Sequence, residues 1–165
     1  MDRKIDLLIS THAELQDQVR FGDSKATAII TFKLVMLAFL RTQVNDINDA
    51  YHNGDVVVIG LFSLFMVTFM ISTIYILKVI VPRVSHHSNK RSSIFFSEIA
   101  EMKEDEYIKF VESQSAEDLS KDYANQIHAL SRIMVIKYAN IQKSIYYFGL
   151  SNICFWVAIL RASLL

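Results

Sequence analysis

The residues with the greatest potential for chemistry are basic and aromatic side chains that could together hold an anion. A helix start at Asp23–Lys25 would offer free backbone N–H groups, which favour phosphate, and Tyr138 could stack on a nucleobase. The same pattern fits a basic ring that meets anionic lipid headgroups, and the residue types alone favour this second interpretation. The candidate ligand-binding residues are Arg20, Asp23, Lys25, Arg132, Lys137 and Tyr138.

Patterns typical of catalysis and of metal binding are missing from the sequence. It has no Gly-x-Ser-x-Gly, no phosphate-binding glycine loop, no paired cysteines and no His-Glu-x-x-His. His86 and His87 are adjacent and therefore point apart, and the lone Cys154 lies within an apolar run, where a packing role is favoured. We expect no enzyme, no metal site and no cofactor. Several acidic residues lie close together in the segment 101–106, and we interpret them as the solvated start of a helix. They are Glu101, Glu104, Asp105 and Glu106.

One uncharged stretch, Val56–Leu77, organises the rest of the chain. As a helix it would be about 33 Å long, enough to cross a hydrocarbon core of about 30 Å. The chain has 165 residues, of which 52% are hydrophobic and 21% charged, a balance that is too apolar for an ordinary soluble domain. The composition therefore indicates a membrane-embedded protein with a modest polar part.

Two further apolar stretches are candidate membrane helices, Ala26–Leu40 and Ile145–Leu160. Lys33 lies within the first, and placing a lysine at the centre of a bilayer costs about 2.5–3.5 kcal/mol on insertion scales. Three interpretations stay open for Lys33. Its side chain could extend to the cytoplasmic headgroups, it could face a water-filled path for ions between subunits, or its helix could lie in the membrane interface.

The polar segments predict helices as well. Residues 2–20 have the apolar spacing of an amphipathic cytoplasmic helix, for which packing on other cytoplasmic helices is favoured over lying on the membrane. Phe21–Lys25 is expected to interrupt it, with Gly22 ending one helix and Asp23 or Ser24 capping the next. The segment Ile94–Glu112 is predicted to form two short helices whose apolar faces must be covered by another part of the protein.

The C-terminal part predicts a single long helix. Ser115 is a suitable N-cap, with Asp118 placed to reach back to it. From Ala116 to Arg161 the chain has no proline, so one helix of about 70 Å would run from the cytoplasm into the membrane. Gly149 and Asn152 are expected to mark a helix contact face.

The distribution of charge predicts the orientation. Basic residues flank the apolar stretches on one side, whereas Thr42–Asp55 is acidic and has no basic residue, so the N-terminus is expected in the cytoplasm and the C-terminus outside. The start, MDRKIDLL, lacks the apolar core of a signal peptide. The predicted fold is an all-α membrane protein with three transmembrane helices and a cytoplasmic helical layer. Its predicted parts are an amphipathic helix (1–20), a transmembrane hairpin (21–82), a cytoplasmic sensor region (83–142) and a third transmembrane helix (143–165).

Several of these positions resemble motifs of the Pycsar transmembrane effector family of bacterial antiphage defence. The segment from Phe21 to Ala26 looks like the family's (A)-D-x-K-A motif, although Gly22 stands where alanine is usual. The stretch from Phe95 to Met102, followed by Glu106-Tyr107, is similar to F-F-x-x-I-A-x-M…E-Y, although Ser97-Glu98 departs from it. The long-helix pattern of the family is matched at Asp122, Gln126-Ile127, Leu130 and Lys137-Tyr138.

This resemblance implies a multi-pass protein of the bacterial inner membrane that senses a cyclic nucleotide made by a neighbouring cyclase on infection. It would then impair membrane integrity so that the infected cell dies or stops growing. A breach needs several copies, so a homo-oligomer in the lipid bilayer is expected, with no nucleic acid polymer as partner. A cyclic mononucleotide, a cyclic dinucleotide and a larger ring all stay open as ligands. The alternatives from the residues alone are a constitutive small channel or transporter subunit with Lys33 near its pore, and a membrane scaffold.

Overall fold

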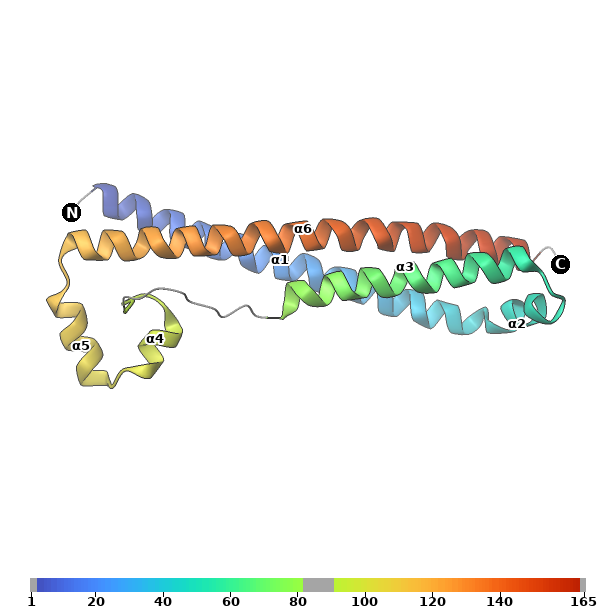
Figure 1. Cartoon of the computed structure of the whole chain (residues 1–165), viewed down its shortest axis with the longest axis horizontal. Helices are drawn as coiled ribbons and strands as arrows, with labels where there is room; N and C mark the ends of the chain where they lie inside the picture. Colours follow the sequence, from blue (N-terminus) through green and yellow to red (C-terminus); the bar gives the residue numbers. More distant parts are fainter. Residues whose placement is uncertain (1–2, 82–90, 164–165) are drawn as a thin grey trace. The chain divides into compact units, whose positions relative to one another are not determined.

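The computed structural model describes residues 3–81 and 91–163, and in these ranges the regular structure is α-helical (Figure 1). The segment that contains Pro82, His86 and His87 lies outside the described residues. Contacts divide the chain into unit 1, formed by Met1–Phe21 and Arg83–Ile136, and unit 2, formed by Gly22–Pro82 and Lys137–Leu165. The helices are α1 (Arg3–Thr42), α2 (Val44–His52), α3 (Val56–Ile80), α4 (Phe96–Glu101), α5 (Glu104–Ser113) and α6 (Ala116–Ala162).

Two helices in the described part of the chain, α3 and α6, are long and apolar enough to cross a membrane. Helix α3 confirms the helix expected at Val56–Leu77 and extends it to Ile80. Helix α6 confirms that the chain after Ser115 is one continuous helix, 47 residues long. A third crossing at residues 26–40 stays a prediction.

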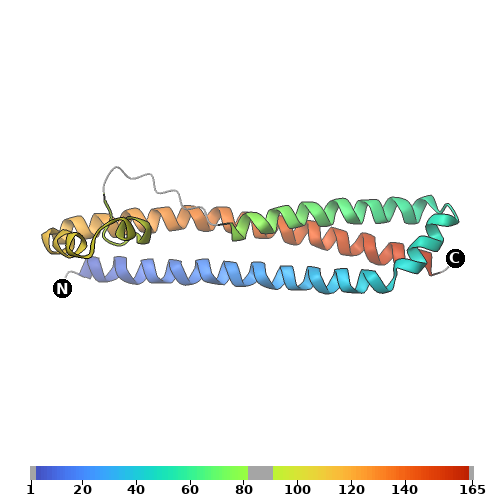
Figure 2. The ribbon, with the colours of Figure 1, turned by 90° about the horizontal axis from the view of Figure 1, so that it is seen from below.

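Helix α1 contradicts the expected interruption at Phe21–Lys25. It runs unbroken from Arg3 to Thr42, so Gly22 and Asp23 lie in its interior (Figure 2). A glycine in a helix costs only about 1 kcal/mol relative to alanine, which packing can offset. Gly22 is buried in unit 2, where Tyr138 and Ile141 of α6 lie beside it. The tertiary contact thus outweighs the local stop signal.

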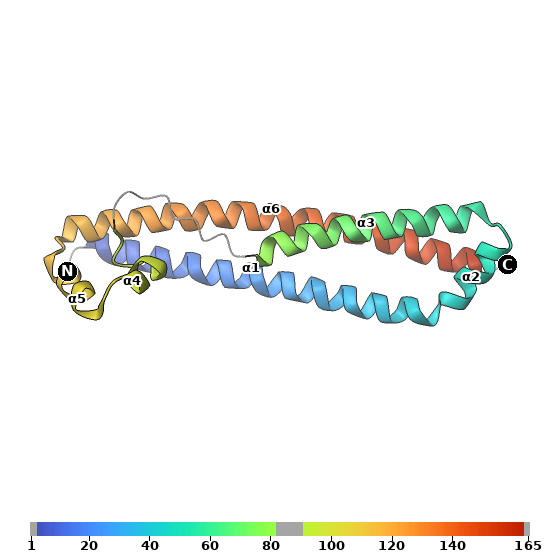
Figure 3. The ribbon, with the colours of Figure 1, turned by 60° about the horizontal axis from the view of Figure 1, so that its bottom comes forward.

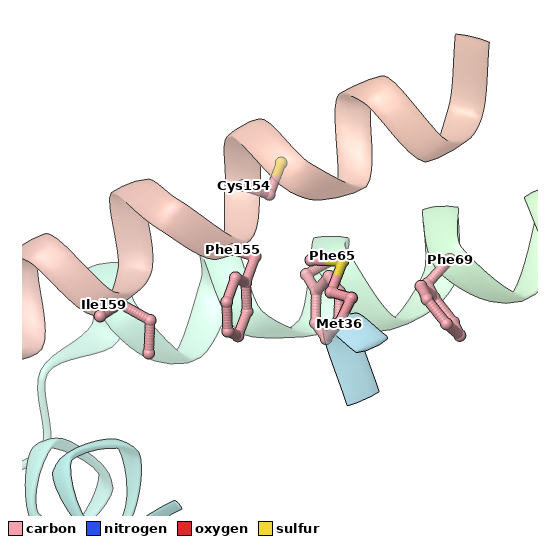
Figure 4. Close-up of a cluster of buried hydrophobic side chains, with 6 residues drawn as sticks. All are labelled: Met36, Phe65, Phe69, Cys154, Phe155 and Ile159. Atoms are coloured by element: carbon pink, nitrogen blue, oxygen red, sulfur yellow. The ribbon is translucent and has the colours of Figure 1, made fainter. Parts of the chain in front are cut away.

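Unit 2 packs α3 against the C-terminal part of α1 and the C-terminal part of α6, with α2 at the α1–α3 connection (Figure 3). Buried apolar side chains, most of them large, follow one another along its centre between α3 and α6 (Figure 4). At one end of the unit Ala26 lies with Ile76 and Ile141, and at the other Ala50 lies with Val58. The central cluster consists of Met36, Phe65, Phe69, Cys154, Phe155 and Ile159.

Polar side chains join α3 to α6 inside this apolar core. Ser72 donates to the backbone carbonyl of Ser144 at 2.7 Å, and Ser144 donates to the carbonyl of Ser72 at 3.0 Å. Both serines are fully buried. The contact face expected at Gly149 and Asn152 is wrong at Gly149, which is exposed. Asn152 is half-buried, lines a groove with Phe32 and Phe39 of α1, and donates to the Phe148 carbonyl of its own helix.

Unit 1 contains the two short helices expected within Ile94–Glu112, which are α4 and α5. The predicted cap of α6 is also confirmed. The hydroxyl of Ser115 accepts from the backbone N–H of Asp118 at 3.1 Å and donates to its carboxylate at 2.5 Å. These predictions depended on neighbouring residues only, which is why the sequence sufficed.

The continuity of α1 predicts that Gly22→Ala stabilises the protein. The added methyl would meet Tyr138 and Ile141 at 3.8 and 3.9 Å, ordinary contact distances, and alanine favours the helix by about 1 kcal/mol. Gly54→Ala is the matched control, because Gly54 has a φ of 71° and alanine is strained there. Thermal unfolding in detergent should show a higher Tm for the first variant and a lower one for the second. A lower Tm for Gly22→Ala would mean that the helix is interrupted after all.

Candidate functional site

The six predicted ligand-binding residues are divided between the two units. Arg20 and Arg132 belong to unit 1, and the other four to unit 2. In unit 2 the Nζ of Lys137 lies 2.5 Å from the carboxylate of Asp23, and the ammonium of Lys25 lies 5.3 Å from the centre of the Tyr138 ring. We call these four residues the α1–α6 junction. Arg20 lies 3.5 Å from Asp17 on the exposed face of α1.

The observed geometry limits how the α1–α6 junction could bind an anion. Because α1 is continuous, Asp23–Lys25 is not a helix start, and the prediction of free N–H groups there is wrong. Asp23 binds Lys137 rather than capping a helix. An anion at Lys137 would have to displace the Asp23 carboxylate, and the Lys137 side chain is only 17% exposed. Anion binding by these residues therefore stays a prediction, while a structural role between α1 and α6 is directly visible.

Lys33 is the second candidate functional residue, and it lies in the interior of unit 2 with 4% exposure. Its ammonium donates to the backbone carbonyl of Phe69 at 3.3 Å and to the hydroxyl of Thr73 at 3.1 Å. It also lies 4.3 Å from the centre of the Phe69 ring and 5.1 Å from that of Phe148. The sequence offered no carboxylate partner, and the structure supplies oxygen dipoles and aromatic faces instead.

The neighbours of Lys33 on α1 point the other way. Phe32, Leu34 and Val35 are 66%, 61% and 61% exposed. The one charged side chain of this stretch is thus turned inward, and the apolar ones are turned outward, as expected of a helix that contacts lipid. The Lys33 side chain contacts α3 and α6 rather than extending along α1 to a headgroup region.

We predict that Lys33→Met leaves unit 2 folded and raises its Tm in detergent. Methionine has a similar length, and replacing a buried charge that has only dipolar partners by an apolar side chain removes a desolvation penalty. Lys33→Glu should lower the Tm, because a carboxylate would face the Phe69 carbonyl, the Thr73 hydroxyl and the electron-rich ring faces. Equal Tm values for both variants would show that the ammonium is not held in this interior position.

A cluster of serine and carboxylate groups organises unit 1, and residue spacing did not identify it. The carboxylate of Asp122 on α6 accepts from the hydroxyls of Ser92 and Ser93, at 3.0 and 3.1 Å, and from the Ser93 N–H at 2.8 Å. Ser93 also donates to Gln114 at 3.0 Å, and its carbonyl accepts from the Tyr107 hydroxyl at 3.0 Å. We call Ser92, Ser93, Gln114 and Asp122 the serine–aspartate cluster. Only the family resemblance had singled out Asp122.

His12 makes the stability of unit 1 sensitive to pH. Burial lowers the pKa of His12 below the ordinary histidine value of about 6.5, and the nearby Asp122 carboxylate offsets this only in part. Its ring lies edge-on to Tyr123, with 5.6 Å between the ring centres. Below pH 6.5 the unfolded chain therefore binds more protons than the folded one, so stability falls as the pH drops toward the native pKa.

We predict that the Tm of the protein declines between pH 7 and pH 5.5 and that His12→Gln makes this decline shallower. Differential scanning calorimetry at several pH values measures the slope directly. The other titrating groups contribute equally to both proteins and cancel in the comparison. Identical slopes would remove His12 as the origin of the pH dependence.

Known proteins are similar to this chain over most of its length. A family model described as the Pycsar effector protein domain, PycTM, matches residues 7–163. The chain is also 29% identical over 142 residues to the Pycsar effector protein SaPycTM of Staphylococcus aureus, a match that covers 85% of each chain. No solved structure matches the chain. The family match confirms the resemblance drawn from the short motifs.

Proposed function

Because the chain belongs to the Pycsar effector family, whose domain model matches residues 7–163, we propose that it is a cyclic-nucleotide-responsive membrane effector that impairs inner-membrane integrity on infection. The family itself implies a role in antiphage defence. The rest of the proposal is supported by the apolar character of unit 2. This unit has an apolar exterior, a filled interior and one buried ammonium, and through α1 and α6 it is continuous with the polar unit 1.

Three crossings are supported by the packing of unit 2. Ala26 of α1 lies in one cluster with Ile76 and Val79 of α3, and Met36 lies in another with Phe65. If α3 crosses the bilayer, residues 26–40 of α1 must occupy the same depth. We propose that the N-terminus is cytoplasmic and the C-terminus is outside, since this orientation satisfies the basic and acidic flanks.

A membrane breach requires more than one copy in this proposal. The centre of unit 2 is filled by aromatic and other apolar side chains, so the described residues of a single chain leave no path for ions at that level. We propose that the effector is a homo-oligomer and that nucleotide binding favours one of two packings of the membrane helices. Binding shifts this equilibrium only by its difference in affinity for the two states. We propose that the α1–α6 junction responds to this change, because Lys137 of α6 pairs with Asp23 of α1 there.

The test is dye leakage from liposomes that contain the protein oriented with its cytoplasmic side outward. We expect leakage to change on addition of one member of a panel of cyclic mononucleotides and cyclic oligonucleotides. Lys137→Ala should weaken this response several-fold, because it leaves Asp23 without its ammonium partner and loosens the α1–α6 junction. Lys25→Ala should act in the same direction through Tyr138.

Lys109→Ala, on the exposed face of α5, is the matched loss of one lysine and should respond as the parent protein does. Full responses in both junction variants would remove the junction from the mechanism. Leakage that is indifferent to every nucleotide would favour a constitutive channel. No leakage in any condition, with orientation verified, would favour a scaffold.

A further inference from the structure

We propose that the nucleotide is bound in a polar cavity of unit 1, formed by Arg91, the C-terminal end of α5 and the first turns of α6. The cavity has a volume of about 360 Å³. This inference rests on the proposed function and names the site at which the signal is read. The residues on which recognition depends are Arg91, Phe110, Gln114, Asp118, Lys121 and Asn125.

The cavity combines the groups that a nucleotide needs. Arg91 and Lys121 supply two cations for a phosphate, and arginine adds the planar donor fork that matches phosphate oxygens. The Phe110 ring offers a face on which a base can stack. Asn125 and Asp118 offer amide and carboxylate groups, the types that pair with the donor and acceptor edge of a base. A lipid headgroup would use the cations but would have no need of a ring and an amide.

Both cations can be transferred to a ligand at small cost. Arg91 lies 2.5 Å from Glu106, and Lys121 lies 2.7 Å from Glu117. The side chains of these pairs are between 49% and 77% exposed, so water screens them and they contribute little to stability. The pKa of Lys121 is raised by Glu117, which keeps the ammonium charged throughout the physiological range. A phosphate held against both cations at once forms stronger charge-assisted bonds than either exposed pair.

The walls of the cavity are fixed before any ligand enters. Gln114 and Asp122 both line it, and both belong to the serine–aspartate cluster, where Ser93 donates to each of them. Arg91 directly precedes Ser92, whose hydroxyl bonds to the same Asp122 carboxylate. A site held in this way loses less conformational entropy on binding. The volume lies at the lower end of the range for small-molecule pockets, about 300–1,000 Å³, and suits one nucleotide unit.

The test measures binding rather than leakage. Equilibrium dialysis of the full-length protein in detergent, against labelled 3′,5′-cyclic mononucleotides and cyclic dinucleotides, gives a Kd for each. We expect a mononucleotide to bind, and Arg91→Gln and Lys121→Gln each to raise its Kd at least tenfold. Lys121→Arg should recover most of the affinity, which separates loss of charge from loss of folding. Phe110→Leu should also weaken binding while the Tm stays near that of the parent protein.

Lys109→Gln is the matched control, since Lys109 is exposed on α5 and does not line the cavity. The inference is overturned if the cavity variants bind as the parent protein does. Loss of binding in Lys137→Gln, with full binding in the cavity variants, would overturn it in favour of the α1–α6 junction. In both cases the parent protein still binds a nucleotide, and the proposed function stands. If the parent protein binds none and its leakage ignores all of them, the proposed function fails together with the site.

Discussion

The arrangement of unit 2 depends on the need to satisfy one ammonium inside an apolar set of helices. A charge without partners at that depth would cost several kcal/mol, so Lys33 must face groups that can accept its protons. Only one rotation of α1 about its axis directs Lys33 at the Phe69 carbonyl and the Thr73 hydroxyl. That rotation also turns Phe32, Leu34 and Val35 outward. The polar interaction therefore determines which apolar face of α1 is exposed on the surface of unit 2.

The need to satisfy buried polar groups also determines the contact between α3 and α6. Ser72 and Ser144 each give a hydroxyl to the other's carbonyl, so two small polar side chains are satisfied where no water is available. Because serine is small, the two backbones can approach closely at this point. Phe65 and Phe155 fill the space between the helices on one side of this contact, and Ile76 and Ile141 fill it on the other. Any state that conducts ions must therefore rearrange helices rather than simply open an existing channel within one chain.

The sequence predicted what neighbouring residues decide and failed where distant ones do. Helix α3, the unbroken α6 and the Ser115 cap follow from composition and local spacing. The break expected near Gly22 also rested on local signals, but Tyr138 and Ile141, more than a hundred residues away, cover that position. The partners of Lys33 are a backbone carbonyl, a hydroxyl and two rings, which carry no recognisable motif. The cavity of unit 1 forms because the fold brings Arg91 close to the start of α6. The spacing of residues along the sequence does not predict that proximity.

The order in which the chain is synthesised gives the Lys33 contacts a further significance. The two groups that accept from its ammonium follow it by 36 and 40 residues, both on α3. The serine contact between α3 and α6 spans 72 residues and has to wait for the C-terminal part of the chain. The pair of helices α1 and α3 therefore contains both hydrogen-bond acceptors of its own lysine, whereas the contact of Lys33 with the Phe148 ring requires the last helix.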